Sequence, residues 1–377
     1  MSDLGQPAPI PLVDLRAAHA EVAQEIAEGW ARVLADTAFI LGPDVAAFER
    51  EFALFSGVKH CVGVANGTDA LELAARAADL GPGDEVILPV NTFIATALAI
   101  ARAGATAVFA DCDPHALLID PDQARARISP HTRAIVAVHL YGQAAPMEPL
   151  ALLAQSHGLL LMEDHAQSQG ATRHGRPCGS LSLAAATSFY PGKNIGAYGD
   201  AGAVLTDDDR LAQRVRDLRN YGGSIKYEHP EMGFNSRLDT LQAVVLRAKL
   251  RRLADGNQAR RAAAALYDAL LAELPEVRRL ALLPGNVSVH HLYPIRVRRR
   301  DAVLKAMQAA GIGVGIHYPK PLHLQGAFAS MGHRPGDFPH AERAASELLS
   351  LPIYPQITPE QQRRVVSVLK ESLARAG

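Results

Sequence analysis

The chain has 377 residues, in which 38 lysines and arginines nearly balance 39 aspartates and glutamates. This balance argues against nucleic acid or an anionic membrane as the main partner, and no apolar run reaches the length of a membrane-spanning helix. Hydrophobic residues, at 48%, suffice for a sizeable core in two domains or one large domain. Three widely spaced cysteines form no metal-binding pattern. With no secretion signal visible in residues 1–15, they predict reduced thiols and a cytoplasmic protein.

Between residue 60 and about residue 210, short apolar runs alternate with segments of helical periodicity. The pattern predicts strands at 60–67, 84–90, 106–112, 133–142, 159–168 and 184–190, and helices at 68–80, 92–104 and 146–158. Because these strands are continuously apolar, we expect a sheet that helices cover on both faces. The alternation predicts an α/β fold with mostly parallel strands.

The segment 238–274 has a helical pattern that is long for one globular helix, so we expect it to connect two domains. Its apolar side chains stand at 238, 241, 244, 245 and 248. A strand at 289–297 and a helix at 300–312 then predict a smaller α+β domain. We place the boundary near residue 245, which divides the chain into a large α/β domain at 1–245 and a small C-terminal domain at 246–377.

Ligands of parallel α/β sheets bind at the C-terminal ends of the strands, so the residues that follow each predicted strand are the candidates for a site. Gly67 and Thr68 follow the first strand, where the N-terminus of a helix could bind a phosphate. An ordinary helix cap is the simpler interpretation of this pair by itself. No glycine-rich dinucleotide motif and no P-loop motif occurs there.

Asp164 follows the apolar run Leu159–Met162, with Gln167 three residues further on. A carboxylate at the end of an apolar strand is costly to bury without a cationic partner. The pair could hold the nitrogen and the hydroxyl of a ring cofactor. A solvent-exposed strand end or a helix cap remains the alternative.

Lys193 lies in a turn of small residues, "YPGKNIGAYG", after the predicted strand at 184–190. An ordinary surface lysine is one interpretation; a phosphate-binding charge and a desolvated amine that forms a Schiff base are the others. Enzymes that use pyridoxal 5'-phosphate (PLP) need such a lysine, a carboxylate for the pyridine nitrogen and a phosphate site. Lys193, Asp164 and the helix start at Gly67 supply all three, and Ser188 could donate to the same phosphate. PLP is therefore the expected cofactor, and no metal is expected.

Motifs along the whole chain then carry a family resemblance. They read "ANGTDALELAARA", "NTFIATALAI", "VHLYGQ", "EDHAQSQGA", "SFYPGKNIGAYGDAGAV", "YGGSIKYEHPEMGFNSRLDTLQA" and "GIHYPKPLHLQ". Together they resemble the DegT/DnrJ/EryC1/StrS aminotransferases, which are PLP enzymes of the aspartate aminotransferase-like fold type I that aminate nucleotide-linked keto sugars. The resemblance runs from about residue 10 to the C-terminus.

The resemblance implies a role for particular residues. Lys193 would be the Schiff-base lysine, Asp164 would pair with the pyridinium nitrogen, and Gln167 would bond the ring hydroxyl. Further cofactor contacts are implied for Phe93 on the ring face and for Gly67, Thr68, Ser188 and Asn235 at the phosphate. Because Asn235 would reach the phosphate from the other subunit, the resemblance implies a homodimer with shared active sites.

The substrate expectation comes from the segment 221–239. It most resembles the subgroup that aminates carbon 3 of dTDP-linked 3-keto-6-deoxyhexoses, with L-glutamate as the amino donor. In that subgroup Lys226, Tyr227 and His317 are at positions that contact the nucleotide diphosphate or the sugar, and Tyr190 is a further candidate for a sugar contact. A solvated loop for Lys226 and Tyr227 and a core histidine for His317 are the alternatives.

Other functions remain open on the sequence. The same chemistry could act on a 4-keto nucleotide sugar, whose enzymes more often carry a histidine in place of Gln167, or on a keto-cyclitol. A PLP-binding regulatory protein without turnover is an alternative of another class, and the presence of Lys193 and Asp164 argues against it.

Two residues depart from the family's usual "EDAAQAHGA"-like motif, namely His165 and Gln169. His165 is adjacent to Asp164 and could tune the site, or it could pack behind it. His290 and His291 are open to the same two interpretations.

Overall fold

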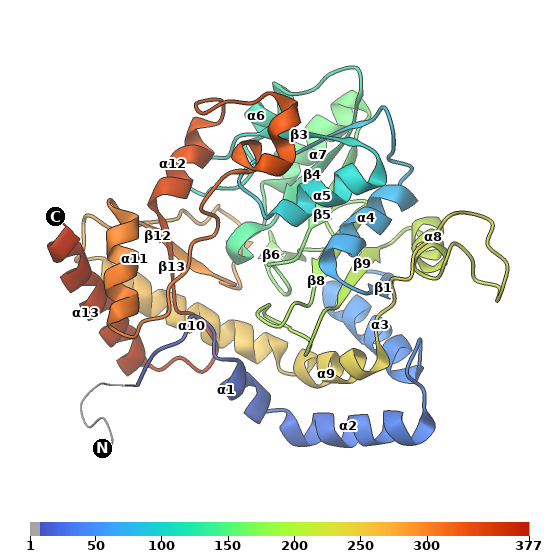
Figure 1. Cartoon of the computed structure of the whole chain (residues 1–377), viewed down its shortest axis with the longest axis horizontal. Helices are drawn as coiled ribbons and strands as arrows, with labels where there is room; N and C mark the ends of the chain where they lie inside the picture. Colours follow the sequence, from blue (N-terminus) through green and yellow to red (C-terminus); the bar gives the residue numbers. More distant parts are fainter. Residues whose placement is uncertain (1–7, 377) are drawn as a thin grey trace.

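A seven-stranded sheet forms the centre of the computed structural model, which describes residues 8–376 (Figure 1). Residues 1–7, part of the segment in which no secretion signal is expected, lie outside the described residues. In pairing order the strands are β1 (His60–Val64), β9 (Gly202–Thr206), β8 (Ala184–Ser188), β5 (Leu160–Asp164), β4 (Thr132–Val138), β2 (Glu85–Pro89) and β3 (Thr106–Ala110).

The strand directions bring the ends of distant strands to one edge of this sheet. β2 pairs in parallel with β3 and β4, β4 with β5, and β5 with β8. β9 is antiparallel to both β8 and β1, so β1 runs in the same direction as β8. The predicted α/β fold with a mostly parallel sheet is confirmed, and the segments that follow β1, β2, β4, β5 and β8 all leave from one edge.

Helices cover both faces of the sheet. One face carries α4 (Gly67–Ala77), α5 (Ile94–Ala103) and α8 (Asp209–Arg219), and the other carries α3 (Pro43–Ser56), α6 (Pro121–Arg125), α7 (Met147–His157) and α9 (Thr240–Leu250). Successive side chains of a strand point to opposite faces: along β2, Val86 and Leu88 pack in the first layer and Ile87 packs in the second. Burial on both faces explains why the strands read as continuous apolar runs.

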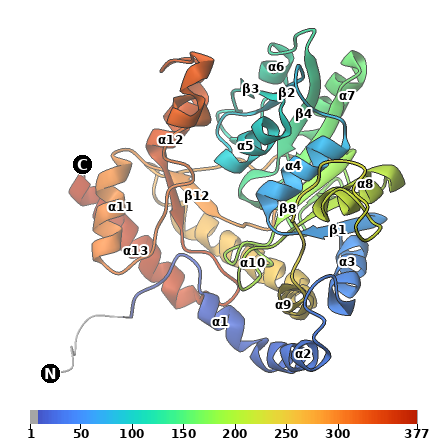
Figure 2. The same ribbon diagram turned by 45° about the vertical axis from the view of Figure 1, so that its right-hand side comes forward.

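A three-stranded sheet and its helices form the C-terminal part (Figure 2). These elements are β10 (Arg278–Arg279), β12 (Tyr293–Arg296), β13 (Leu348–Leu351), α10 (Leu253–Leu271), α11 (Arg300–Ala309), α12 (Pro339–Glu347) and α13 (Pro359–Ala376). Ile10, near the N-terminus, pairs with Ile312 and belongs to the apolar core of this part. The division at residue 245 stays a prediction; that residue lies within α9.

The remaining elements are short or lie at the N-terminus. They are α1 (Leu15–Ala20), α2 (Ala23–Asp36), β6 (Thr172–Arg173), β7 (Arg176–Pro177), β11 (Asn286–Val287) and the 3-10 turns η1 (Leu140–Gly142), η2 (Leu322–Leu324) and η3 (Gly326–Met331). Across residues 8–376, no helix combines the length and the apolar character that crossing a bilayer requires.

The helical segment predicted at 238–274 forms two helices, α9 and α10. The helix breaks at Arg251 and Arg252, and both side chains form ion pairs with Glu25 of α2. Periodicity continues across the break, so the pattern does not reveal it. α9 packs under the large sheet, whereas α10 supports the C-terminal part.

Candidate active site

The start of α4 lies against the end of β8. Asn66 caps the helix by accepting the N–H of Asp69 at 2.8 Å. A Cβ atom on Gly67 would lie 2.5 Å from Cβ of Ser188, so only glycine lets the two segments approach this closely. The first N–H groups of a helix have no acceptor within the helix. The arrangement therefore places an anion-binding helix start beside the Ser188 hydroxyl.

Asp164 ends β5 and is 6% exposed. Its Oδ2 accepts the hydroxyl of Thr96 at 2.8 Å, and its Oδ1 accepts the N–H of Ala166 at 3.1 Å. Thr96 comes from the first turn of α5, and no local sequence pattern connects it with Asp164. The carboxylate is thus buried, bonded through both oxygens and fixed in orientation.

Gln167 joins two segments that are distant in the sequence, one that follows β4 and one that follows α11. Its Oε1 accepts the backbone N–H of Tyr141 at 2.7 Å, and its Nε2 donates to the hydroxyl of Tyr318 at 3.2 Å. The Tyr318 ring lies 5.4 Å from the ring of Phe93, which precedes α5 and is half exposed. Tyr141 has a φ of +64°, a conformation that costs energy in a residue other than glycine and is often found at functional sites. Sequence reasoning missed Tyr141 and Tyr318, because no local pattern links them to Gln167.

Bonds from α9, from α10 and from the segment that precedes β12 hold the turn that carries Lys193. Asn194 donates to the side chain of Asn257 at 2.8 Å and to the carbonyl of Val289 at 3.1 Å. Its Oδ1 lies 3.1 Å from Nδ1 of His291. Lys249 donates to the carbonyl of Gly196 at 2.5 Å. The turn that carries Lys193 is therefore firmly held at the lysine's C-terminal neighbours, Asn194 and Gly196.

Burial lowers the pKa values of three basic side chains in the site. Burial lowers the pKa of Lys193 to about 8, and the nearby Asp164 carboxylate only partly opposes this shift. Burial, followed by the charge of Lys193, lowers the pKa of His317 to about 4 and that of His291 well below its usual value. Both imidazoles are then neutral near pH 7, and neither repels a protonated Lys193.

His165 and Gln169 both pack behind the site. Nδ1 of His165 lies 2.6 Å from the hydroxyl of Ser168, and burial lowers the pKa of this histidine to about 3. Gln169 donates to the hydroxyl of Thr187 at 2.8 Å and to the carbonyl of Ser188 at 3.1 Å. These contacts favour the packing interpretation. His165 stays neutral, and Gln169 stabilises the end of β8 through its hydrogen bonds.

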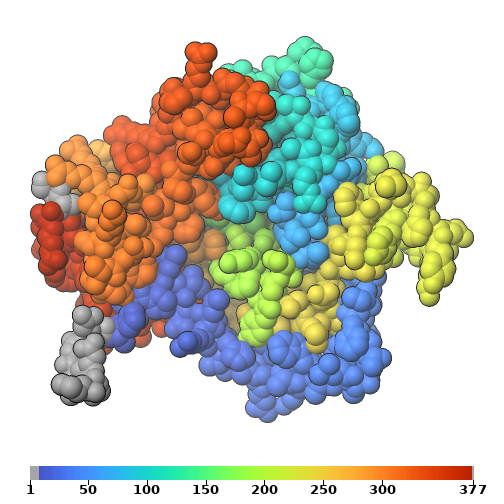
Figure 3. Space-filling view, viewed as in Figure 1, coloured from blue at the N-terminus to red at the C-terminus, as the bar shows by residue number. Residues whose placement is uncertain are grey.

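Three of the predicted site residues, Lys226, Tyr227 and Asn235, are not brought against Lys193 within this chain. Lys226 and Tyr227 lie on a loop that projects beyond α8, where Nζ of Lys226 is 5.0 Å from the Tyr227 ring (Figures 1 and 3). Asn235 is exposed at the base of the loop. Tyr190 is in the Lys193 turn itself: its carbonyl accepts the N–H of Lys193 at 2.8 Å, and the residue is 60% exposed. His317 is also close to Lys193, and its Nδ1 lies 2.9 Å from the hydroxyl of Ser350.

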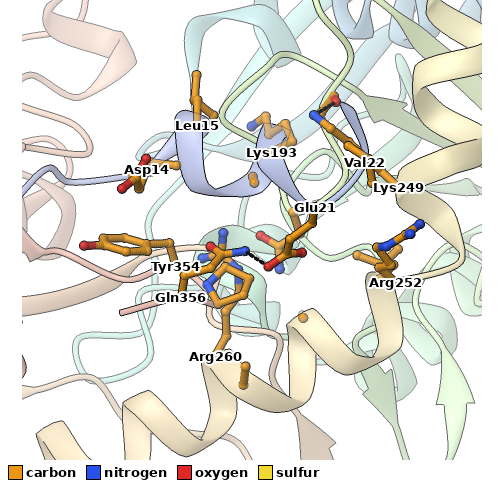
Figure 4. A pocket seen from close by; sticks show the side chains of 18 of the residues that line it. Asp14, Leu15, Glu21, Val22, Lys193, Lys249, Arg252, Arg260, Tyr354 and Gln356 are labelled. Atoms are coloured by element: carbon orange, nitrogen blue, oxygen red, sulfur yellow. Dashed lines mark hydrogen bonds between the residues drawn. The ribbon is translucent and has the colours of Figure 1, made fainter. Parts of the chain in front are cut away.

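A cavity of about 560 Å³ lies beside the Lys193 turn, between α1 and the start of α10 (Figure 4). Arg260 and Lys249 line it, and both already bond to backbone carbonyls. Glu21 in the same wall accepts a bond from Gln356. In the part of the chain that the structure describes, no cluster of three or more histidine, cysteine or acidic side chains could hold a metal ion.

Residues 20–370 match the model of the DegT/DnrJ/EryC1/StrS aminotransferase family. The chain belongs to this family. The prediction of a PLP-dependent aminotransferase is thereby confirmed. The residues present also fit that cofactor: a helix start beside Ser188 for a phosphate, a buried carboxylate at Asp164, and an amine of lowered pKa at Lys193.

Members of the family that resemble this chain carry different names. A dTDP-3-amino-3,4,6-trideoxy-alpha-D-glucose transaminase of Streptomyces venezuelae is 44% identical, over 98% of each chain. A UDP-N-acetyl-3-dehydro-alpha-D-glucosamine 3-aminotransferase of Acidithiobacillus ferrooxidans is 45% identical, over 97% of this chain and 98% of its own. A "pleiotropic regulatory protein" of Geobacillus stearothermophilus is 44% identical, over 96% of this chain and 98% of its own.

A solved structure of the family has the same fold. The S. venezuelae protein DesV, crystallised in complex with a ketimine intermediate, superposes with a TM-score of 0.95 at 45% identity, covering 97% of this chain and 98% of its own. The prediction of an aspartate aminotransferase-like α/β fold is confirmed. The family's members act on sugars linked to more than one nucleotide, so membership establishes a sugar aminotransferase without fixing its substrate.

Proposed function

We propose that this aminotransferase transfers the amino group of L-glutamate to carbon 3 of a nucleotide-linked 3-keto-6-deoxyhexose, with dTDP as the nucleotide. The observation that carries the catalytic part is the buried amine of Lys193 beside Asp164, at the sheet edge that also holds the start of α4. The names of the relatives support carbon 3, since the dTDP and the UDP enzymes are both named for that position.

Each residue has a proposed part in holding the cofactor. The start of α4 at Gly67 and Thr68, with the Ser188 hydroxyl, binds the phosphate. Asp164 bonds the ring nitrogen and keeps it protonated. Phe93 stacks on the ring. PLP, when bound, supplies an electron sink for the carbon from which a proton is removed.

Gln167 donates from Nε2 to the ring hydroxyl oxygen. Its orientation follows from the structure, because the N–H of Tyr141 already occupies the Oε1 end of the amide.

Lys193 is the proposed acid–base group. Because its pKa is near 8, a useful fraction of the amine is neutral close to physiological pH. Nζ of Lys193 takes the proton from the α-carbon of glutamate and later returns a proton to carbon 3 of the sugar. The held backbone at Asn194 and Gly196 keeps the base in place while its side chain moves.

A homodimer with shared sites completes the proposal. The loop that carries Lys226 and Tyr227 projects beyond α8 and exposes apolar side chains. These are Tyr221 (46% exposed), Ile225 (62%), Tyr227 (82%) and Met232 (92%). Such a loop suits burial against a second subunit.

In the proposed dimer, Asn235 reaches the phosphate of the partner's site, and Lys226 and Tyr227 contact the sugar nucleotide there. His317 and Tyr190 come from the subunit that holds the cofactor. The three buried free cysteines fit the proposed cytoplasmic location.

The first half of the reaction tests this function without any sugar. Purified protein loaded with PLP should convert L-glutamate to 2-oxoglutarate once per site and lose its visible absorbance band. Reduction with borohydride should instead attach the cofactor permanently to Lys193, which is detected as an increase in the mass of the peptide that contains it. Lys193→Ala protein should show neither the conversion of glutamate nor the attached cofactor. Loss of the band with alanine or aspartate but not with glutamate would contradict the proposed donor.

The regulatory alternative has a relative's name in its favour. A protein that only senses the cofactor would bind PLP and yet give no 2-oxoglutarate in this assay. The proposed function requires turnover, so the same experiment separates the two.

A further inference from the structure

The carboxylate of Asp164 ends a chain of buried hydroxyl groups. Thr96 Oγ1 lies 2.8 Å from Oδ2 of Asp164, and Thr92 Oγ1 lies 3.0 Å from Thr96 Oγ1. Both threonines are buried: Thr96 is 0% exposed and Thr92 is 3% exposed. Neither hydroxyl is needed to cap α5, whose N-cap residue Phe93 makes no side-chain cap bond.

The direction of the chain follows from counting protons. An ionised carboxylate only accepts, so the single proton of the Thr96 hydroxyl must be donated to Asp164. The Thr96 oxygen is then left to accept, and Thr92 must be its donor. A chain that runs in one direction towards a charge strengthens each of its bonds.

These bonds also fix the plane of the carboxylate. Ala166 donates to Oδ1 from one side and Thr96 donates to Oδ2 from the other. Thr96 lies in the first turn of the helix that begins after Phe93, so one helix start positions both the aromatic ring and the carboxylate. The positive end of the α5 dipole lies at the same place and favours the negative charge.

We propose that Thr96, supported by Thr92, is a positioning residue that keeps the Asp164 carboxylate aimed at the pyridine nitrogen. The proposal rests on the role proposed above for Asp164. It has a specific consequence: PLP is bound covalently through Lys193, whereas pyridoxamine phosphate, the form present after the first half-reaction, is not. Loss of the Thr96 hydroxyl should therefore weaken retention of pyridoxamine phosphate more than retention of PLP.

Four variants separate this role from packing. Thr96→Val keeps the shape and removes the hydroxyl, Thr96→Ser keeps the hydroxyl, and Thr92→Val removes only the second donor. Thr132→Val is the matched control, since Thr132 is a buried threonine at the start of β4, on the opposite edge of the sheet. Pyridoxamine phosphate affinity is measured by titration, and ring protonation by the ¹⁵N chemical shift of ring-labelled cofactor.

We expect Thr96→Val to bind pyridoxamine phosphate about tenfold or more weakly, the size expected for a lost bond to a charged group, and to shift the ¹⁵N signal towards the unprotonated ring. Thr96→Ser should resemble the wild type, Thr92→Val should show a smaller effect of the same sign, and Thr132→Val should show none. Wild-type affinity and ¹⁵N shift in Thr96→Val, or equal losses in the valine and serine variants, would overturn the proposal. If Thr96→Val does not fold, an unchanged ¹⁵N shift and affinity in Thr92→Val would overturn it equally.

No sugar takes part in these measurements. A wrong sugar assignment would leave them unchanged, so failure of this inference and failure of the proposed substrate are distinguishable.

Discussion

Oε1 of Gln167 accepts the backbone N–H of Tyr141 at 2.7 Å, and this bond decides which end of the amide faces the site. The amide nitrogen is left to donate, and Tyr318 already takes one of its two protons. The positive φ of Tyr141 is the conformation that presents its N–H to the side chain.

Gln167→Glu isolates the donor from the acceptor. The new carboxylate can still accept the N–H of Tyr141, but it offers no proton to the ring hydroxyl oxygen. We expect PLP affinity to fall about tenfold or more, as measured by titration of the visible band. Gln143→Glu is the control, since Gln143 is a buried glutamine whose bonds go to the segment 281–286; it should lower stability while leaving the spectrum of the bound cofactor unchanged. Unaltered affinity in Gln167→Glu would exclude the donor role.

Gly67→Ala tests the close approach of α4 to β8. The added Cβ would lie 2.5 Å from Cβ of Ser188, so the helix start must move. We expect a loss of about 1–3 kcal/mol in the free energy of unfolding, together with weaker PLP binding because the phosphate site is displaced. Urea unfolding and cofactor titration measure the two effects. Gly81→Ala, where the nearest atom to the new Cβ lies at 4.0 Å, serves as the control, and equal behaviour of the two variants would contradict the prediction.

The stability of the cofactor-free protein should depend on pH through Lys193. Its pKa falls from 10.5 to about 8 on folding, so between these values the unfolded chain binds more protons and stability rises with pH. Below pH 8 the full penalty of burying a charged amine is present. Lys193→Met should therefore be the more stable protein at pH 7, by on the order of 1–3 kcal/mol, with a smaller advantage at pH 10. Urea unfolding of both proteins, with the exposed Lys59→Met as a control, checks the sign; an advantage that grows with pH would refute it.

Shared active sites predict complementation between two inactive variants. In a mixed dimer of Lys193→Ala and Asn235→Ala, one site would carry both defects and the other would carry neither. When the two variants are co-refolded or co-expressed, about half of the dimers should be mixed, and one of the two sites in each mixed dimer should be intact. The mixture should therefore recover roughly a quarter of wild-type activity. Each variant by itself should stay inactive or nearly so. Failure to recover activity in verified mixed dimers would place Asn235 in the site of its own subunit.

The local parts of this account could be predicted from the sequence. The apolar runs of β5 and β1 end at or just before Asp164 and Gly67, because a buried strand is followed by polar or turn-forming residues where it leaves the sheet. The positions of these two residues at the ends of strands could therefore be predicted. The bonds that complete the site could not be predicted in this way. Thr96 meets Asp164 across 68 positions of the chain, and Gln167 meets Tyr318 across 151. No periodicity carries such pairings.

Two other features depend on tertiary or quaternary contacts. The break between α9 and α10 is stabilised by Glu25 from a distant helix, and it leaves the helical pattern intact. The loop with Lys226 and Tyr227 projects beyond α8 and is exposed (Figure 1), so its proposed role depends on a second chain.

The substrate is the central claim, and a panel of keto sugars tests it most directly. Enzyme converted to its pyridoxamine form with L-glutamate is offered dTDP- and UDP-linked sugars with the keto group at carbon 3 or at carbon 4, and amino-sugar formation is followed by mass spectrometry. The account predicts a 3-amino product, formed fastest from the dTDP-linked 3-keto-6-deoxyhexose. Turnover of 4-keto sugars with none of the 3-keto sugars would contradict it.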